Sequence, residues 1–117
     1  MEIGAQLYTV REHTKTLEDF SRTLEKIAAI GYRNVQVSGT CAYEPAWLKA
    51  ELDRTGLRCV LTHTDPGRIA AETDAVAAEH QAFGCTHIGI GSLPGGFDKG
   101  LAGYQTFAET YRPVGRR

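Results

Sequence analysis

Ile30-Gly31-Tyr32 ends a helical pattern and begins a short apolar run, and two later stretches repeat this arrangement. They are Thr55-Gly56-Leu57 and Phe83-Gly84-Cys85. A glycine after a helical pattern is typical of a helix that ends in left-handed backbone and continues into a strand. The three glycines lie 25 and 28 residues apart, which suits one strand–helix unit of a parallel sheet.

Four short strands are predicted around these junctions, because each segment is rich in Val, Ile or Leu and is bounded by turn residues. They cover residues 3–8, 34–38, 58–63 and 87–91. Strands joined by helices of this length run parallel, with right-handed connections.

Helices are predicted after each strand. Thr16, with Asp19 three residues later, resembles a capping box at the start of the first helix. Pro45 and Pro66 suit the first turns of the second and third helices. Two further apolar faces at helical spacing predict one continuous third helix and a fourth helix. Their members are Ile69, Val76 and Phe83 for the third, and Leu101, Tyr104, Ala108 and Tyr111 for the fourth.

The alternation of side chains along the strands separates two architectures. Val35 and Val37 share an apolar face, while the opposite face carries Gln6, Gln36 and His63. A doubly wound sheet buries both faces under helices and prefers apolar residues on both. A polar second face favours the inside of a barrel. We therefore predict an α/β chain, a single (β/α)4 domain over residues 1–117 that forms half of a TIM barrel.

Composition excludes several classes of function. The 117 residues carry a net charge of -1, which gives no electrostatic footprint for nucleic acid. No apolar run reaches the ~18 residues of a membrane span, and the start lacks a cationic secretory signal. Three cysteines without metal-type spacing predict reduced thiols in a cytoplasmic protein, with Cys59 and Cys85 acting as small hydrophobes.

Four stretches, in order, resemble the sugar phosphate isomerase/epimerase family, and together they span essentially the whole chain. They are residues 4–11 (GAQLYTVR), 24–37 (LEKIAAIGYRNVQV), 61–64 (LTHT) and 83–88 (FGCTHI). That family shares a xylose isomerase-like TIM barrel with inosose dehydratases, ketose 3-epimerases and endonucleases of the endonuclease IV type. The resemblance implies that this chain is the N-terminal half of such a barrel.

In the family, acidic and histidine side chains at the ends of the later strands hold a divalent metal, which helps move a proton between adjacent sugar carbons. The resemblance therefore implies Mn, Mg or Zn in a completed barrel only, with no metal bound by this chain alone. The second strand of the family commonly carries Glu where this chain has Gln36. That exchange would replace a base with a hydrogen-bonding amide.

His63 is the predicted catalytic residue, because it ends the third strand, where barrels of this kind place their active sites. A histidine satisfied by loop backbone is the alternative. Gln6 and Gln36 could bind sugar hydroxyls or form a buried polar layer. Tyr8 and Arg11 are predicted substrate-binding residues at the top of the first strand, although Arg11 could equally be a surface residue. His80 is expected to be at the surface or partly packed.

A half barrel exposes two sheet edges and its interior face, and exposed edges pair with other chains. We therefore expect a homodimer that closes eight strands, or a complex with a complementary C-terminal half. Three functions remain open: an isomerase/epimerase half that is inactive until completed, a non-catalytic self-associating half barrel, and an endonuclease IV-like phosphodiesterase fragment. The last needs a basic groove, which the charge does not supply.

Overall fold

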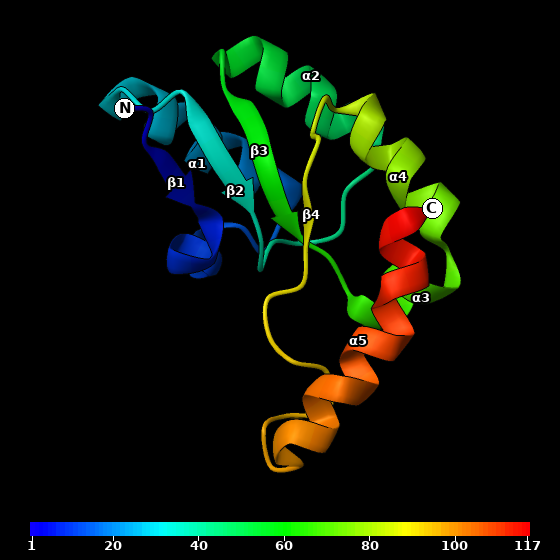
Figure 1. Cartoon of the computed structure of the whole chain (residues 1–117). Coiled ribbons are helices and arrows are strands. Elements are labelled where there is room, and N and C mark those ends of the chain that lie inside the picture. The colour runs from blue at the N-terminus through cyan, green and yellow to red at the C-terminus, as the bar shows by residue number, and fades with distance from the viewer.

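The four predicted strands form one parallel sheet in the order β1-β2-β3-β4 in the computed structural model, which describes residues 1–117 (Figure 1). The predicted half barrel is confirmed as the fold class. The strand bounds are Gly4–Gln6 for β1, Asn34–Val37 for β2, Arg58–His63 for β3 and Ile88–Gly89 for β4.

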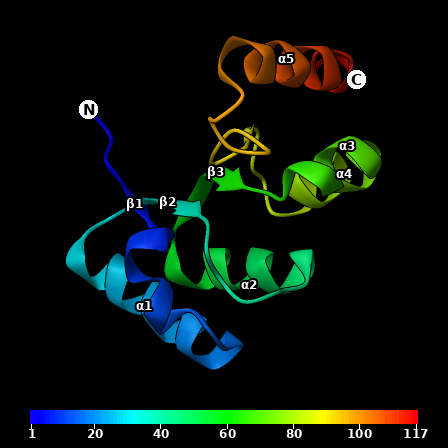
Figure 2. The same ribbon diagram turned by 90° about the horizontal axis from the view of Figure 1, so that it is seen from below.

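The helices lie along one face of this sheet and leave the opposite face open. Seen from below in Figure 2, they follow the bend of the sheet in chain order, as the outer layer of a barrel does. The bounds are Leu7–His13 for the 3-10 helix η1, Leu17–Ile30 for α1, Pro45–Thr55 for α2, Pro66–Ala71 for α3, Thr73–Ala82 for α4 and Gly100–Arg116 for α5.

The hydrophobic core lies between the helices and the covered face of the sheet. Phe20 of α1 and Leu48 of α2 are fully buried against Val35 of β2. The ring of Phe20 meets Trp47 edge-on at a centroid distance of 5.2 Å. Burial of this apolar layer is the main stabilising term, at roughly 25 cal/mol per Å² of apolar surface removed from water.

The helix boundaries follow the chemistry seen in the sequence. The hydroxyl of Thr16 accepts a hydrogen bond from the backbone N–H of Asp19 at 3.1 Å, which confirms the predicted cap. Gly31 ends α1 with φ at 117°, in the left-handed region that glycine adopts without strain. Its N–H bonds back to the carbonyl of Ala28, so the helix end and the turn into β2 are fixed together.

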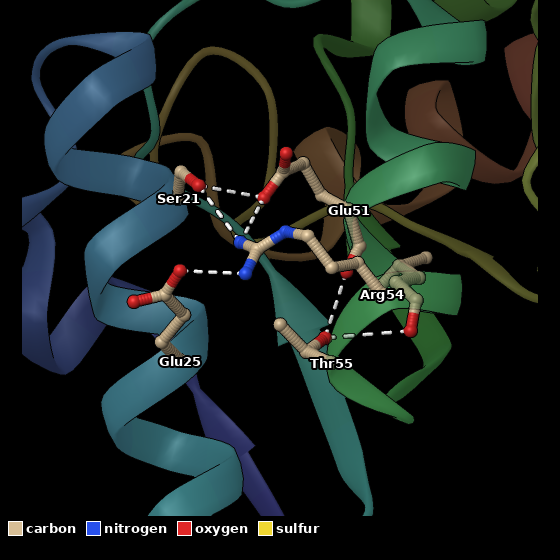
Figure 3. A network of polar contacts seen from close by, with 6 residues as sticks. Ser21, Glu25, Glu51, Arg54 and Thr55 are labelled. Atoms are coloured by element: carbon tan, nitrogen blue, oxygen red, sulfur yellow. Dashed lines mark hydrogen bonds and ion pairs between the residues drawn. The ribbon is translucent and has the colours of Figure 1, made fainter.

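A polar seam joins the exposed sides of α1 and α2 (Figure 3). The guanidinium of Arg54 lies between Glu25 of α1 and Glu51 of its own helix and donates to both carboxylates. Ser21 of α1 donates to Glu51 at 2.7 Å. The Arg54 hydrogen bond holds the pKa of Glu51 below its ordinary value, so this carboxylate is charged over most of the pH range.

Three expected elements differ from the structure. The first strand ends at Gln6 rather than at Tyr8, because the chain turns into η1 and buries Leu7 completely in the core. The fourth strand has two residues instead of five. The single third helix is two helices, since Glu72 has non-helical backbone, with φ -127° and ψ 41°. That break lets Arg68 of α3 fold back onto Glu79 of α4.

An extra residue sits in the middle of β3. Val35 is opposite Cys59 and Gln36 is opposite Leu61, so Val60 has no partner on β2. A bulge of this kind shifts the alternation of side chains by one. Cys59 and Thr62 therefore both face the helices and are buried, although they are three residues apart.

The apolar face predicted for the fourth helix is not covered. No residue of α5 is buried, and Leu101 and Tyr104 are 73% and 51% exposed. The helix is attached through Tyr111, whose hydroxyl donates to the carbonyl of Pro66 at 2.9 Å. Across the chain, no helix combines the length and the apolar character needed to cross a membrane.

Candidate functional site

Three of the predicted site residues are neighbours on the open face of the sheet. Gln6 of β1 is opposite Gln36 of β2, and Nε2 of Gln36 lies 2.6 Å from Nε2 of His63, at the end of β3. The bulge at Val60 is what brings His63 to this face, because strict alternation would place it with the buried Cys59. The structure therefore assembles Gln6, Gln36 and His63 at the carboxyl ends of adjacent strands.

Glycines of β4 and the following turn make room for the imidazole of His63. A Cβ on Gly91 would lie 3.0 Å from Nδ1 of His63. A Cβ on Gly89 would lie 2.8 Å from the carbonyl oxygen of Thr62 and 3.2 Å from Cδ2 of His63. The ring is therefore packed against bare backbone on one side and against the Gln36 amide on the other.

The contact with Gln36 fixes the hydrogen-bonding role of His63. The amide nitrogen of Gln36 can only donate, so Nε2 of His63 accepts and the proton of the neutral ring is on Nδ1. That tautomer presents an N–H donor on the side of the ring nearer Gly91. The site thus offers amide groups that donate and accept, together with one imidazole that carries an N–H donor.

Tyr8 and Arg11 form a separate group on η1, beyond the end of β1. The guanidinium of Arg11 lies 4.4 Å from the centre of the Tyr8 ring, and its Nη1 donates to the Tyr8 carbonyl at 3.0 Å. The ring rests on Gly39, where a Cβ would come within 2.7 Å of Tyr8 Cδ2. The structure records no contact between this pair and His63. Tyr8 and Arg11 therefore form a second polar group at the carboxyl-end rim of the sheet.

A cleft of about 460 Å³ lies beside the site, between the loop after β2 and helices α3 and α4. Its wall includes Ser38, which is 3% exposed and whose hydroxyl has no hydrogen-bond partner. The ion pair between Arg68 and Glu79 borders the cleft, and His63 stands at its edge. This cleft could not be predicted from the sequence, since its walls come from segments that are distant along the chain.

The expectation that His80 lies at the surface or is only partly packed is wrong. Its side chain is buried, with Nδ1 2.8 Å from the carbonyl of Val76 and Nε2 2.6 Å from the hydroxyl of Thr62. Because a carbonyl only accepts, Nδ1 carries the proton and Thr62 donates to Nε2. Thr64 completes the chain at 2.9 Å from Thr62. Strand alternation could not have shown this, because Thr62 faces the helices only through the bulge at Val60.

The chain contains no group of three or more His, Cys, Asp or Glu side chains placed to hold a metal ion. On the open face, the assembled side chains are two amides and one imidazole, with no carboxylate among them. Divalent cations such as Mg²⁺ and Mn²⁺ are held mainly by carboxylates in proteins. The open face of this chain therefore offers no ligand set for such a cation.

No family model matches the sequence, and no curated protein matches it. Several solved structures do match this chain. The chain is 19% identical to a sugar phosphate isomerase/epimerase from Parabacteroides distasonis, with a TM-score of 0.71, covering 98% of this chain and 46% of that one. An AP endonuclease of family 2 from Brucella melitensis is 21% identical, with a TM-score of 0.67 and coverage of 97% and 50%.

A xylose isomerase domain protein from Salmonella typhimurium gives a TM-score of 0.55 at 10% identity, covering 95% of this chain and 45% of that one. This chain thus spans about half the length of each of these three structures. Identities this low show shared architecture. The resemblance seen in the sequence is confirmed at that level, and the chain has the fold of half a TIM barrel.

Proposed function

We propose that this chain is the N-terminal half of a sugar phosphate isomerase/epimerase-like barrel and becomes functional only when a second half completes it. The observation that carries the proposal is the hydrogen-bonded pair of Gln36 and His63 on the uncovered face, at the carboxyl end of the sheet. Active sites of TIM barrels lie at this end of the strands. The similarity to half of a sugar phosphate isomerase/epimerase supports it.

In the completed barrel, Gln6 and Gln36 would bind sugar hydroxyls, since amides both donate and accept. His63 would donate its Nδ1 proton to a substrate oxygen or take a proton from it. Arg11, already ordered against Tyr8, would hold a phosphate at the rim through its planar fork of donors. This chain lacks a ligand set for a metal, and a second copy would add none, so only a different C-terminal half would hold one.

The completing half in this proposal is a second copy of the same chain. The outer edges of β1 and β4 have no partner strand within the chain, so both carry free backbone donors and acceptors. Two copies related by a two-fold axis would supply eight strands and pair each β4 edge with the β1 edge of the other copy. The same closure would cover the open polar face.

The test is solution mass by light scattering, followed by a titration with a sugar phosphate monitored by NMR. A dimer of the 12.8 kDa chain whose His63 signals shift on addition of ribulose 5-phosphate or fructose 6-phosphate supports the proposal. His63→Ala should leave the mass unchanged and weaken binding by roughly tenfold, the loss of one or two hydrogen bonds. A folded monomer that binds no sugar phosphate would refute it.

A non-catalytic, self-associating half barrel is the second candidate, favoured by the absence of carboxylates among the assembled residues of the open face. Titration with Mn²⁺ separates the two ideas further. A homodimer alone should bind Mn²⁺ weakly, because two copies of the site add no acidic ligand. Tight Mn²⁺ binding would favour a catalytic metal site. The AP endonuclease likeness has less support, since the net charge of -1 supplies no basic groove for DNA.

A further inference from the structure

Two of the three cysteines lie next to each other across the last pair of strands. In the β3–β4 pair, Thr62 is opposite Ile88 and His63 is opposite Gly89. Cys59 and Cys85 each stand three residues before this pair along the chain, and the two thiols interact, since Cys85 raises the pKa of Cys59. Neighbouring strands are about 4.8 Å apart, which falls in the 4.4–6.8 Å range of Cα separations that a disulfide can span.

Both thiols also point to the same side of the sheet. Cys59 and Cys85 are each 4% exposed and belong to one hydrophobic cluster between the sheet and the helices. The Sγ atom of Cys85 lies 3.2 Å from the carbonyl of His87. Burial, together with the neighbouring thiol of Cys85, raises the pKa of Cys59 to about 12. The two sulfur atoms are therefore close in the same dry environment.

We propose that Cys59 and Cys85 form a latent dithiol that a small-molecule disulfide such as oxidised glutathione converts into a cross-strand disulfide. This inference is independent of the proposed sugar chemistry. The third cysteine, Cys41, lies in the loop after β2 and is partly exposed, so it serves as an internal reference thiol.

The exchange takes two steps. The thiolate of one cysteine attacks a sulfur of oxidised glutathione, forming a mixed disulfide and releasing one glutathione thiolate. The thiolate of the other cysteine then attacks the cysteine sulfur of that mixed disulfide and releases the second glutathione. The protein loses two protons and two electrons as the Sγ–Sγ bond forms, and the glutathione disulfide is reduced to two thiols.

Local opening of β4 controls the rate of this reaction. A buried thiol with a raised pKa is almost entirely protonated at neutral pH and is therefore a poor nucleophile. However, β4 has only two residues and pairs with one neighbour, so it can open far more easily than the whole sheet unfolds. We expect slow oxidation in buffer and a several-fold acceleration in low urea.

Formation of the Cys59–Cys85 disulfide would hold β4 against β3. Gly89 and Gly91, against which the His63 ring rests, follow Cys85 by only a few residues. A disulfide that joins β3 to the residues just before β4 would restrict the opening of this segment. The redox state of the pair would thus set how firmly the outer edge of the sheet and the backbone beside His63 are ordered.

The test uses the whole chain, incubated with oxidised glutathione with and without 1–2 M urea (about half of a typical small-domain midpoint). The protein is then alkylated under denaturing conditions, and its intact mass is measured by mass spectrometry. We expect one alkylated thiol in the oxidised protein and three in the reduced protein. Trypsin should release a cross-linked pair of peptides 59–68 and 69–99, while peptide 34–49 carries the alkylated Cys41. The melting temperature should rise by roughly 10 °C and return on addition of dithiothreitol.

Matched variants complete the experiment. Cys41→Ser should oxidise as the wild type does, whereas Cys59→Ala and Cys85→Ala should give no cross-link and no reversible rise in melting temperature. Circular dichroism would show whether these variants are folded, and the wild-type peptide map does not depend on them. Stable mixed disulfides without a 59–85 bond, a cross-link through Cys41, or a lower melting temperature after oxidation would each overturn the proposal.

Discussion

At the scale of single residues, the site depends on one side chain held from two directions. The amide of Gln36 donates to Nε2 of His63 at 2.6 Å, and the backbone of Gly91 approaches the opposite edge of the ring. An imidazole so constrained has a defined tautomer before any ligand arrives. The ring therefore presents its proton in a fixed direction.

The tautomer of His63 can be measured directly. When the His63 ring is uncharged, its Nε2 should show the ¹⁵N chemical shift of an unprotonated imidazole nitrogen, and its Nδ1 should show that of a protonated one. Gln36→Leu removes the donor and should give averaged shifts for the two nitrogens. His80, whose Nδ1 is bonded to the Val76 carbonyl, is an internal control and should keep the Nδ1–H form in both proteins. An Nε2–H form of His63 in the wild type would contradict the assigned contact.

The sequence could indicate the face of the sheet on which His63 lies. It could not indicate how the side chains pack on the covered face behind it. Gln36 and His63 were expected on one face, and the structure confirms this. The contact of Thr62 with the buried His80 depends on the bulge at Val60, and the contact of Arg68 with Glu79 depends on the break at Glu72. Neither irregularity has a local signature, because both are selected by tertiary packing rather than by propensity.

At the scale of elements, helix ends were the most predictable features, since their chemistry is local. Thr16, Pro45 and Pro66 begin helices as expected, and Gly31 ends one. Strand lengths were less predictable. The first and fourth strands are shorter than their apolar patterns suggested, because Leu7 turns into the core and β4 has a partner on one side only.

Removal of the α1 cap should have a measurable cost. Thr16→Ala leaves the N–H of Asp19 without its acceptor and should lower the free energy of unfolding by about 1 kcal/mol in urea denaturation. Thr16→Ser keeps the acceptor and should restore most of this loss. Thr106→Ala, at an exposed interior position of α5, should be neutral or slightly stabilising because alanine is the better helix former. Equal losses for Thr16→Ala and Thr106→Ala would argue against a capping role.

The seam between α1 and α2 should make stability depend on pH in acid. The folded-state pKa of Glu51 is lowered by its bond to Arg54, so the unfolded chain takes up this proton first as the pH falls. The stabilisation is complete above the ordinary value of 4.5 and is lost as the pH drops toward the folded-state pKa. Unfolding free energies measured from pH 7 to pH 3 should therefore fall less steeply in Glu51→Gln.

Arg54→Gln provides the matched control for this pH dependence. If the two side chains act through each other, Arg54→Gln should flatten the acid limb as Glu51→Gln does, and the double variant should flatten it no further. Strictly additive effects of the two substitutions would mean that Glu51 is stabilised by groups other than Arg54.

At the scale of the whole molecule, half of the sheet's surface has no cover within the chain. Leu61 lies on the open face, opposite Gln36 and beside the position of Gly89. The helix layer, with its buried core of Phe20, Leu24 and Leu48, was predictable from periodicity. What covers the open face was not, because nothing in one chain's pattern specifies its partner.

A charge on the open face should separate the two copies of the proposed dimer. Leu61→Lys would bury an ammonium group inside a closed barrel and should shift the light-scattering mass from a dimer to the 12.8 kDa monomer. Ile30→Lys is the matched control, since Ile30 is 74% exposed at the end of α1, away from the open face. A Leu61→Lys protein that remains dimeric while folded would place the interface elsewhere.

The unpaired residue in β3 also bears on how this chain can tolerate insertions and deletions. Removing Val60 would restore one-to-one pairing with β2 and would leave Cys59, Thr62 and His63 on the faces they occupy now. Removing Thr62 instead would leave the bulge in place and would shift His63 into a helix-facing position. Within this strand, a lost codon at Val60 is therefore one that the site can survive.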